Sequence, residues 1–387
     1  MANNRGVKNK PICCVAQNNW MEGNELAEKV TRKTIAEITG TSISVVSRAL
    51  NNSGYVEAKK KKDILRVADE LGYVRNPVTL SLEEKRTKQI LFYCKDLSNA
   101  FNVELYYGMV KAAKARGYMA LLNANLKFDN IKDALIDGII LQNNYFTDLY
   151  CETYGKNYHL PVVGASFGIA KSHPVSIPVI EWDMEDAMNK AIDYLRKRGH
   201  KKIAFGSQYA FDDRSIDLRG LTWKRTMKEV FGDRLEEYFL DVTLPPYSST
   251  VALEKPNIDA GEDDEIYNEE TYADKGRIAA RIFLDRQLDA TAVICFNDEY
   301  TLGFMNELQR SGLKIPDDLS ILSFDGIERR KIAYPKPVSI SPDPIQFGFN
   351  LANLLLDRIE HKKIHYYAKQ PIRITAGESV KDIRGKK

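Results

Sequence analysis

The chain has 387 residues, of which 44% are hydrophobic and 28% are charged, which is typical of a globular protein with more than one hydrophobic core. The formal net charge of +3 hides an asymmetry, because residues 1–89 carry 16 Lys and Arg against 10 Asp and Glu, whereas the remainder carries 40 against 43. A basic N-terminal part favours a polyanionic partner for that part, or else a solvated lysine-rich helix.

The cysteines and the N-terminal segment indicate the cellular compartment in which the protein is expected. Five cysteines without Cys-x-x-Cys or Cys/His ligand spacing favour a reducing, cytoplasmic environment over a disulfide framework. The apolar run at residues 12–16 is too short for a signal peptide or a membrane span. Residues 1–30 show no regular periodicity, so we expect a disordered leader, with translation starting at Met1 or Met21.

Residues 31–75 predict three short helices around one apolar centre. The first two are separated by Gly40-Thr41-Ser42, with Ser42 in the position of an N-cap, and Gly72 ends the third. A tight turn between the first two helices is the layout of a helix-turn-helix domain. The expected apolar faces consist of Ile35, Ala36 and Ile38, then Ile43, Val46, Ala49 and Leu50, then Ile64, Leu65, Ala68 and Leu71.

From Gln89 onward, short apolar strands alternate with amphipathic helices, which predicts parallel sheets covered by helices on both faces. The expected strands are 90–93, 119–122, 138–141, 161–164, 202–205, 292–296 and 321–324, and the expected helices are 103–117, 184–198, 218–230, 300–311 and 345–359. Segment 259–270 holds seven acidic residues and no basic one, and we interpret it as a solvated loop because it lacks the spacing of a calcium site.

The string Thr31-Arg-Lys-Thr-Ile-Ala-Glu-Ile-Thr-Gly-Thr-Ser-Ile-Ser-Val-Val-Ser-Arg-Ala-Leu-Asn51 resembles the start of LacI/GalR-family proteins. Further similarities follow in the family's order at 52–56, 70–73, 96–101, 115–118, 137–140, 198–205, 297–299, 315–320, 324–326 and 377–379. The resemblance covers about residues 31–380. It implies an α plus α/β fold: a helix-turn-helix head, a hinge helix, and a core like periplasmic sugar-binding proteins, with two doubly wound parallel subdomains.

The same resemblance divides the chain into regions. The head is expected at 31–75, the hinge helix and linker at 76–88, and a ligand-binding and dimerisation core at 89–380. Within the core, one subdomain is expected at about 89–165 with 341–366, and the other at about 170–339 with 371–380.

The resemblance also implies which residues of this sequence contact DNA. Arg48 could make a bidentate contact with guanine, whereas helix capping or a turn would also account for Ser47 and Asn51. A hinge leucine that wedges into the minor groove corresponds to Leu82, unless residues 76–82 form a plain linker. The complete set is Ile43, Ser44 and Arg48 for bases, Thr31, Ser47 and Asn51 for phosphates, and Leu82 for the minor groove.

A ligand cleft is expected beyond the carboxyl ends of the strands, where the two halves of such a core meet. The residues that follow the predicted strands are Phe101, Asn102, Ser166, Phe167, Asn297 and Asp325. Aromatic, amide and carboxylate groups together suit a sugar or a nucleoside. Asp325 matches the family's ligand-binding aspartate, whereas Asn297 and Asp298 are also candidates for helix caps.

Two features depart from the family pattern. Asp217 stands where the family commonly has Arg, and we also place Asp217 in the ligand site. The loss of a cation argues against a carboxylate or phosphate ligand at that place and leaves a sugar or an amine-bearing ligand. Residues 125–137 are about a dozen residues shorter than usual, so we expect one helix of the first subdomain to be short or absent.

We therefore expect a sequence-specific DNA-binding transcription regulator, more often a repressor than an activator in this family, which binds a pseudo-palindromic operator as a homodimer and responds to a sugar-like or nucleoside-like effector. The alternative, a sugar-binding protein without a DNA role, would need a signal peptide and no head. The sequence has no P-loop, GxSxG or HExxH motif, so we expect no enzymatic activity, cofactor, metal or membrane partner.

Overall fold

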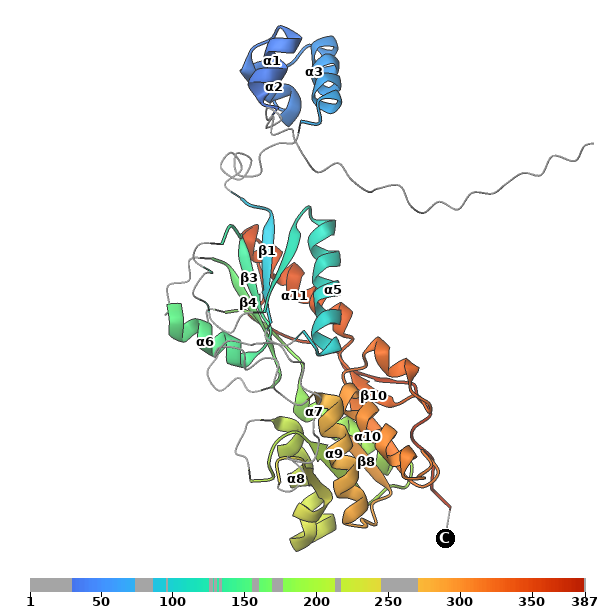
Figure 1. Ribbon diagram of the computed structural model, residues 1–387. Helices are drawn as coiled ribbons and strands as arrows, with labels where there is room; N and C mark the ends of the chain where they lie inside the picture. Colours follow the sequence, from blue (N-terminus) through green and yellow to red (C-terminus); the bar gives the residue numbers. More distant parts are fainter. Residues whose placement is uncertain are drawn as a thin grey trace, which may run out of the picture. The chain divides into compact units, whose positions relative to one another are not determined.

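The computed structural model describes residues 30–73, 86–94, 97–124, 128, 131, 134–154, 160–168, 177–212, 217–244 and 271–385. The chain divides into two compact units, residues 1–80 and residues 81–387 (Figure 1). No helix among the described residues is long and apolar enough to cross a bilayer.

The first unit contains three helices, α1 (Arg32–Thr39), α2 (Ile43–Asn51) and α3 (Ala58–Glu70). Thr31 accepts a hydrogen bond from the backbone N–H of Thr34 and so caps α1, and Ser42 caps α2 in the same way through Val45. Gly40 ends α1 in the left-handed conformation, which a glycine adopts without steric cost. These caps produce the tight turn of a helix-turn-helix.

The apolar centre of the head is smaller than the sequence indicates. Ile35, Val46 and Ile64 are fully buried, but Ile38 is 57% exposed and Leu65 is 44% exposed. Leu71 is also exposed. Short helices bury only a narrow stripe, so apolar residues at its margin remain in contact with solvent.

The second unit consists of two lobes, each built on a six-stranded sheet. The first lobe has the strand order β11-β5-β4-β3-β1-β2 with all strands parallel. Its strands are β1 (Gln89–Tyr93), β2 (Met119–Asn123), β3 (Gly138–Leu141), β4 (Val162–Ser166), β5 (Val179–Glu181) and β11 (Tyr367–Lys369), and its helices are α5 (Ala100–Ala115), α6 (Asn144–Tyr154) and α11 (Pro344–Ile359).

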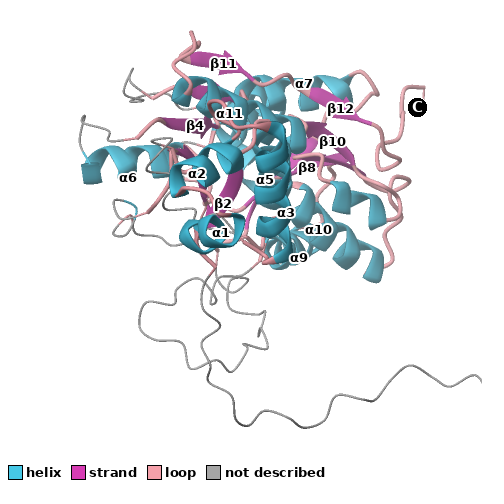
Figure 2. Ribbon diagram, turned by 90° about the horizontal axis from the view of Figure 1, so that it is seen from above, coloured by secondary structure: helices cyan, strands magenta, loops and turns pink. Residues whose placement is uncertain are grey.

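The second lobe has the strand order β12-β10-β9-β8-β6-β7, with only β12 antiparallel to its neighbour. Its strands are β6 (Ile203–Ser207), β7 (Phe239–Asp241), β8 (Ala292–Cys295), β9 (Ser320–Phe324), β10 (Val338–Ser341) and β12 (Arg373–Thr375). Its helices are α7 (Met184–Arg196), α8 (Leu218–Phe231), α9 (Tyr272–Asp285) and α10 (Asp298–Arg310), with 3-10 turns at Gly232–Tyr238 and Glu328–Ile332. Helices lie on both sides of the strands (Figure 2).

In each lobe, two helices touch backbone to backbone through a pair of glycines. A Cβ added at Gly108 in α5 would lie 1.9 Å from the carbonyl oxygen of Ile345, and one at Gly348 in α11 would lie 1.9 Å from that of Leu105. Gly276 in α9 and Gly303 in α10 make the equivalent contact in the second lobe. These pairs fix the packing of α5 against α11 and of α9 against α10.

Every helix and strand expected in the core is present, with ends shifted by a few residues, but several elements carried no clear signal. The unexpected ones are β5, β7, β10, β11, β12, α6 and α9. Strands of three or four residues are too short for a recognisable period. β5 pairs in the first sheet, so the first lobe extends beyond the expected limit near residue 165.

Several predicted features lie wholly or partly outside the described residues. They are the leader at 1–30, the hinge with Leu82, the acidic segment 259–270, and most of the shortened passage 125–137.

Candidate nucleic-acid interface and ligand cleft

The outer face of α2 presents the side chains expected to contact bases. Ile43 is 50% exposed, and Ser44 and Arg48 are exposed, whereas Val46 and Ala49 pack into the head on the opposite face. Ile43 therefore does not belong to the apolar face that the sequence predicts for it. An exposed isoleucine can instead contact a thymine methyl group.

Arg48 lies along the surface of its own helix. Its Nε donates a hydrogen bond to the carbonyl oxygen of Ser44 at 3.4 Å, and its Nη1 donates to that of Tyr55, also at 3.4 Å. Both bonds are long and exposed, so rotation of the side chain toward a base would cost little. Long, exposed bonds leave Arg48 available to a partner.

The expected phosphate-contacting residues have structural roles as well. Thr31 is exposed and forms the capping box of α1 with Thr34. Ser47 accepts a hydrogen bond from Nη1 of Arg32 at 3.2 Å, and Asn51 is the last residue of α2. Capping therefore explains Thr31, whereas Ser47 joins α2 to α1.

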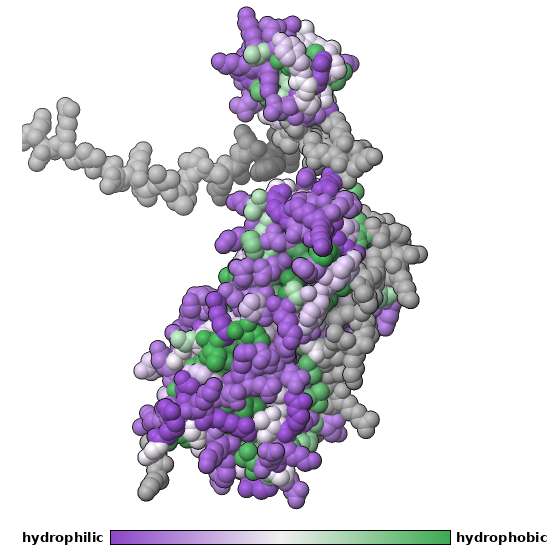
Figure 3. Space-filling view, turned by 180° about the vertical axis from the view of Figure 1, so that it is seen from behind, coloured by the Kyte–Doolittle hydropathy of each residue, from purple (hydrophilic) through white to green (hydrophobic). Residues whose placement is uncertain are grey.

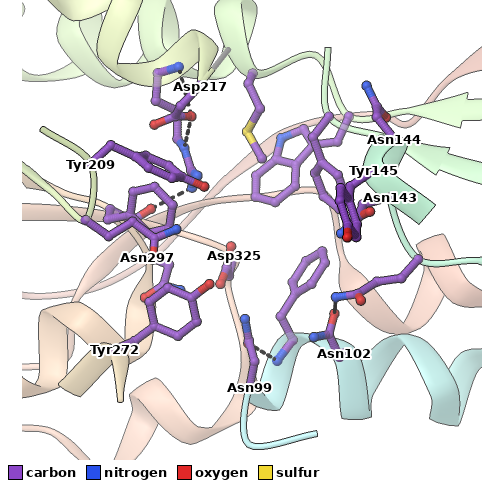
Figure 4. Close-up of a pocket in the computed structure, with 18 residues that line it drawn as sticks. Asn99, Asn102, Asn143, Asn144, Tyr145, Tyr209, Asp217, Tyr272, Asn297 and Asp325 are labelled. Atoms are coloured by element: carbon purple, nitrogen blue, oxygen red, sulfur yellow. Dashed lines mark hydrogen bonds and ion pairs between the residues drawn. The ribbon is translucent and has the colours of Figure 1, made fainter. Parts of the chain in front are cut away.

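A cavity of about 280 Å³ lies between the two lobes of the second unit (Figure 4). Of the seven ligand-binding residues predicted from the sequence, six line it: Phe101, Asn102, Phe167, Asp217, Asn297 and Asp325. Ser166 does not, because it is fully buried in β4, where its Oγ accepts a hydrogen bond from the backbone N–H of Gly168. The last residue of a strand need not point toward the crevice.

Aromatic rings form two groups on the cavity wall. In the first, the ring of Phe101 stacks on Trp182 at 5.6 Å and contacts Phe167 at 6.2 Å. In the second, Phe296 stacks on Tyr272 at 5.8 Å and meets Tyr209 edge-on at 5.7 Å. Two apolar platforms with polar groups between them are typical of small-molecule sites.

The polar groups from the first lobe are amides. The Nε2 of Gln142 donates to Oδ1 of Asn102 at 2.9 Å, and Asn143 and Asn144 lie beside them on the same wall (Figure 4). The sequence analysis missed Gln142, Asn143 and Asn144, although they directly follow the predicted strand 138–141. An amide both donates and accepts hydrogen bonds, as a hydroxyl group does.

Asp325 projects into the middle of the cavity (Figure 4). Its φ is +95° and that of Gly326 is +73°, a backbone conformation that is strained for an aspartate. The Oγ of Ser341 holds this turn by donating to the carbonyl oxygen of Asp325 at 2.9 Å. Burial, with a contribution from Asp298, raises the pKa of the Asp325 carboxyl well above its usual range.

Asp217 lies beside a cation, contrary to the expectation that the site lacks one. Oδ1 of Asp217 accepts from Nε of Arg219 at 3.0 Å, and the Arg219 guanidinium lies 3.6 Å from the ring centre of Phe296. Burial opposes the charge of Arg219, but the attraction of Asp217 and Asp325 outweighs burial and raises the pKa of Arg219. The sequence analysis considered Asp217 and not Arg219, two residues further along the chain, as a residue of the site.

Asn297 and Asp298 occupy the start of α10. Asn297 caps this helix through the backbone N–H of Tyr300 at 2.9 Å while it also lines the cavity. Asp298 does not cap the helix, because its Oδ2 accepts from the backbone N–H of Ile327 at 2.8 Å. Complete burial raises the pKa of Asp298 to about 6.

Two glutamates join the two lobes. Oε1 of Glu299 accepts from the backbone N–H of Ala100 at 3.2 Å, and Oε1 of Glu104 accepts from that of Glu328 at 2.7 Å. Each bond runs from one lobe to the other, so each depends on how the lobes are closed. Among the described residues, no group of His, Cys, Asp or Glu side chains has the arrangement of a metal site.

Two family models match the chain. "Bacterial regulatory proteins, lacI family" matches residues 31–76, and "Periplasmic binding protein-like domain" matches residues 192–380. Among curated relatives, the HTH-type transcriptional repressor PurR of Vibrio vulnificus is 28% identical over 86% of this chain and 93% of its own length. Catabolite control protein A of Priestia megaterium is 26% identical over 84% of this chain and 91% of its own length. These relatives are named as regulators, not enzymes.

Solved structures share the fold. The Lac repressor dimer bound to operator and the anti-inducer ONPF has a TM-score of 0.69 and 19% identity, over 92% of this chain and all of that one. The complex of the transcriptional regulator CelR with cellobiose has a TM-score of 0.58 and 20% identity, over 90% of this chain and 99% of that one. The likeness confirms the expected fold: a helix-turn-helix followed by two parallel-sheet lobes.

Proposed function

This chain belongs to the lacI family of bacterial regulatory proteins, and we propose that it represses transcription by binding a pseudo-palindromic operator as a homodimer, with an affinity set by a small ligand in the cleft. Because a regulator of this kind binds an operator, we also propose that it acts in the cytoplasm. The exposed face of α2 is the observation that carries the proposal.

Ile43, Ser44 and Arg48 lie on one solvent-facing strip of α2, and its opposite face is anchored in the head. A helix held in this way enters the major groove and offers its outer side chains to base edges. Thr31 at the start of α1, Ser47 in the middle of α2 and Asn51 at its end are proposed to contact phosphates, which orient the head. From the family resemblance alone, Leu82 is proposed as the minor-groove wedge.

Exposed apolar side chains in both lobes support self-association. On the first lobe, Met119 of the edge strand β2 and Tyr107 of α5 are largely exposed. On the second, Tyr334 is 86% exposed and, with Leu302, lines a groove of about 740 Å³. Hydrophobic patches interrupt the hydrophilic surface in Figure 3. Such patches favour a protein partner, and a second copy would pair two heads on two half-sites.

Substitution Arg48→Ala tests the DNA assignment. Each lost guanine contact costs about 1–3 kcal/mol, so operator affinity should fall about 10-fold or more while affinity for random DNA changes little. Competition gel shifts against random DNA measure both. Arg66→Ala is the matched control, because Arg66 is an exposed arginine of the same head that pairs with Glu70 on α3.

Retained sequence preference in Arg48→Ala would exclude Arg48 as a reader of bases. A native protein that binds a sugar but shows no preference for any DNA sequence would favour the second candidate function, a sugar-binding protein without a DNA role.

A further inference from the structure

Arg219 and Asp217 form an ion pair in the wall of the cleft, and neighbouring groups hold the arginine in place. Arg219 is only 8% exposed, and three contacts fix its guanidinium: Nε donates to Oδ1 of Asp217, Nη1 donates to the carbonyl oxygen of Phe296 at 2.7 Å, and the ring of Phe296 lies beneath it. Nη2 has no partner among the described residues, although Arg219 lines the cavity. Arg219 therefore has one donor group left for a ligand.

Asp217 offers no such group to a ligand. Its Oδ1 accepts from both the backbone N–H and Nε of Arg219, at 3.3 and 3.0 Å. Its Oδ2 is buried and has no hydrogen-bond partner within the part of the chain that the structure describes. Oδ1 is thus occupied by Arg219 and Oδ2 is buried, so Asp217 acts on a ligand through Arg219.

We propose that Asp217 acts as the counter-ion of Arg219, and that this pairing makes the cleft select uncharged ligands over anionic ones. The inference rests on the proposed role of the cleft as the effector site. It replaces the direct ligand contact that the sequence assigned to Asp217 with an indirect role, in which Asp217 balances the charge of Arg219.

The physical reason lies in the charge balance of the pair. An arginine keeps its proton at any ordinary pH, so an unpaired guanidinium in a cleft attracts carboxylates and phosphates. Asp217 cancels that charge and leaves the Nη2 group as a donor. Asp325, which lies in the same cavity, offers acceptor oxygens (Figure 4). A donor and an acceptor in one cavity suit neighbouring hydroxyls of a neutral polyol.

Asp217 also caps α8, so the test must separate its charge from its structural role. Asp217→Asn does so, because asparagine caps a helix as well as aspartate does and its Oδ1 still accepts from Arg219. The change removes the negative charge and replaces the buried Oδ2, which has no partner among the described residues, with an amide nitrogen. Asp217→Ser is the second test variant if the asparagine variant folds poorly, because serine is also a neutral residue that caps helices.

The experiment is calorimetric titration of the full-length protein with inorganic phosphate, glucuronate and glucose. We expect Asp217→Asn to bind phosphate and glucuronate about 10-fold more tightly than the native protein, with no such gain for glucose. The double variant Asp217→Asn/Arg219→Gln should lose the gain. Asp343→Asn is the matched control, because Asp343 likewise caps a helix and pairs with an arginine, Arg373, but does not line the cavity.

No gain for either anion in Asp217→Asn and Asp217→Ser would overturn the proposal, as would an equal gain in Asp343→Asn. The proposed function fails separately. If the anions bind the variant more tightly but no cleft ligand alters operator affinity in a gel shift, the charge selectivity holds and the cleft is not the effector site.

Discussion

The two lobes share one architectural plan but present different chemistry to the cleft. Each has a six-stranded sheet and a helix that starts at the cavity with an asparagine cap, Asn99 for α5 and Asn297 for α10. Yet the charged residues that line the cavity, Asp217, Arg219 and Asp325, all come from the second lobe, whereas the first lobe contributes mainly amides and aromatic rings.

The shared plan of the lobes, meaning their common architecture, and the way in which each lobe recognises a ligand are therefore set by different residues. Glycines and buried apolar side chains fix the plan, whereas the side chains that follow the strands determine what is recognised. We infer that the second lobe sets charge selectivity and the first contributes hydrogen bonds to hydroxyls. Both the shared plan and the contrast between the lobes can be tested by substitution.

The largest effect is expected where the lobes are alike. In Gly303→Ala the new Cβ would lie 1.9 Å from the carbonyl oxygen of Ala273, and in Gly348→Ala 1.9 Å from that of Leu105. Because backbone, not a flexible side chain, is in the way, each variant should lose about 3 kcal/mol or more of unfolding free energy, measured by urea denaturation.

Gly220→Ala is the control for this pair. It lies in α8, and a Cβ there meets only ordinary contacts, the nearest at 3.7 Å. Alanine favours a helix over glycine by about 1 kcal/mol, so this variant should be unchanged or more stable. A large loss in only one of Gly303→Ala and Gly348→Ala would show that the two helix pairs are not equivalent.

Asp325→Asn tests the charged side of the cleft. Asparagine tolerates the positive φ of this position but is a weaker acceptor, so affinity for a ligand found by a thermal-shift screen of sugars and nucleosides should fall about 10–100-fold. Operator affinity without ligand should stay within about twofold, because the head is a separate unit. Unchanged ligand affinity would remove Asp325 from the site.

The head could be predicted from the sequence more completely than the ligand cleft. The helix-turn-helix is local: caps, turn and exposed strip fall between Thr31 and Asn51, so Gly40 and Ser42 could be placed from the sequence. The cleft is assembled from distant segments, and the pairing of Asp217 with Arg219 depends on the turn of α8 and on Phe296, 77 residues away. No spacing rule in one sequence reveals that pairing.

Asp298→Asn probes a difference at equivalent helix starts, where the residue after the cap is Ala100 in the first lobe and Asp298 in the second. Burial raises the pKa of Asp298 to about 6, so the folded state holds this proton more tightly than the unfolded state does. This contribution to stability is present at low pH and is lost as pH rises from about 4 to about 6.

Relative to the native protein, Asp298→Asn should therefore gain about 1–3 kcal/mol between pH 4 and pH 7, because asparagine does not ionise. Urea denaturation of both proteins across this range measures the gain. A stability difference that does not change with pH would mean that Asp298 does not carry the raised pKa.

The smallest effect is expected in the first lobe. Gln142→Ala removes the amide that donates to Asn102 at 2.9 Å, a neutral hydrogen bond worth about 0.5–1.5 kcal/mol, so ligand affinity should fall no more than about 10-fold. The ratio of affinities for glucuronate and glucose should not change, because no charge is altered, whereas Asp217→Asn should change that ratio. If Gln142→Ala shifts the ratio as well, charge selectivity is a property of the whole cleft, and the contrast between the lobes does not hold.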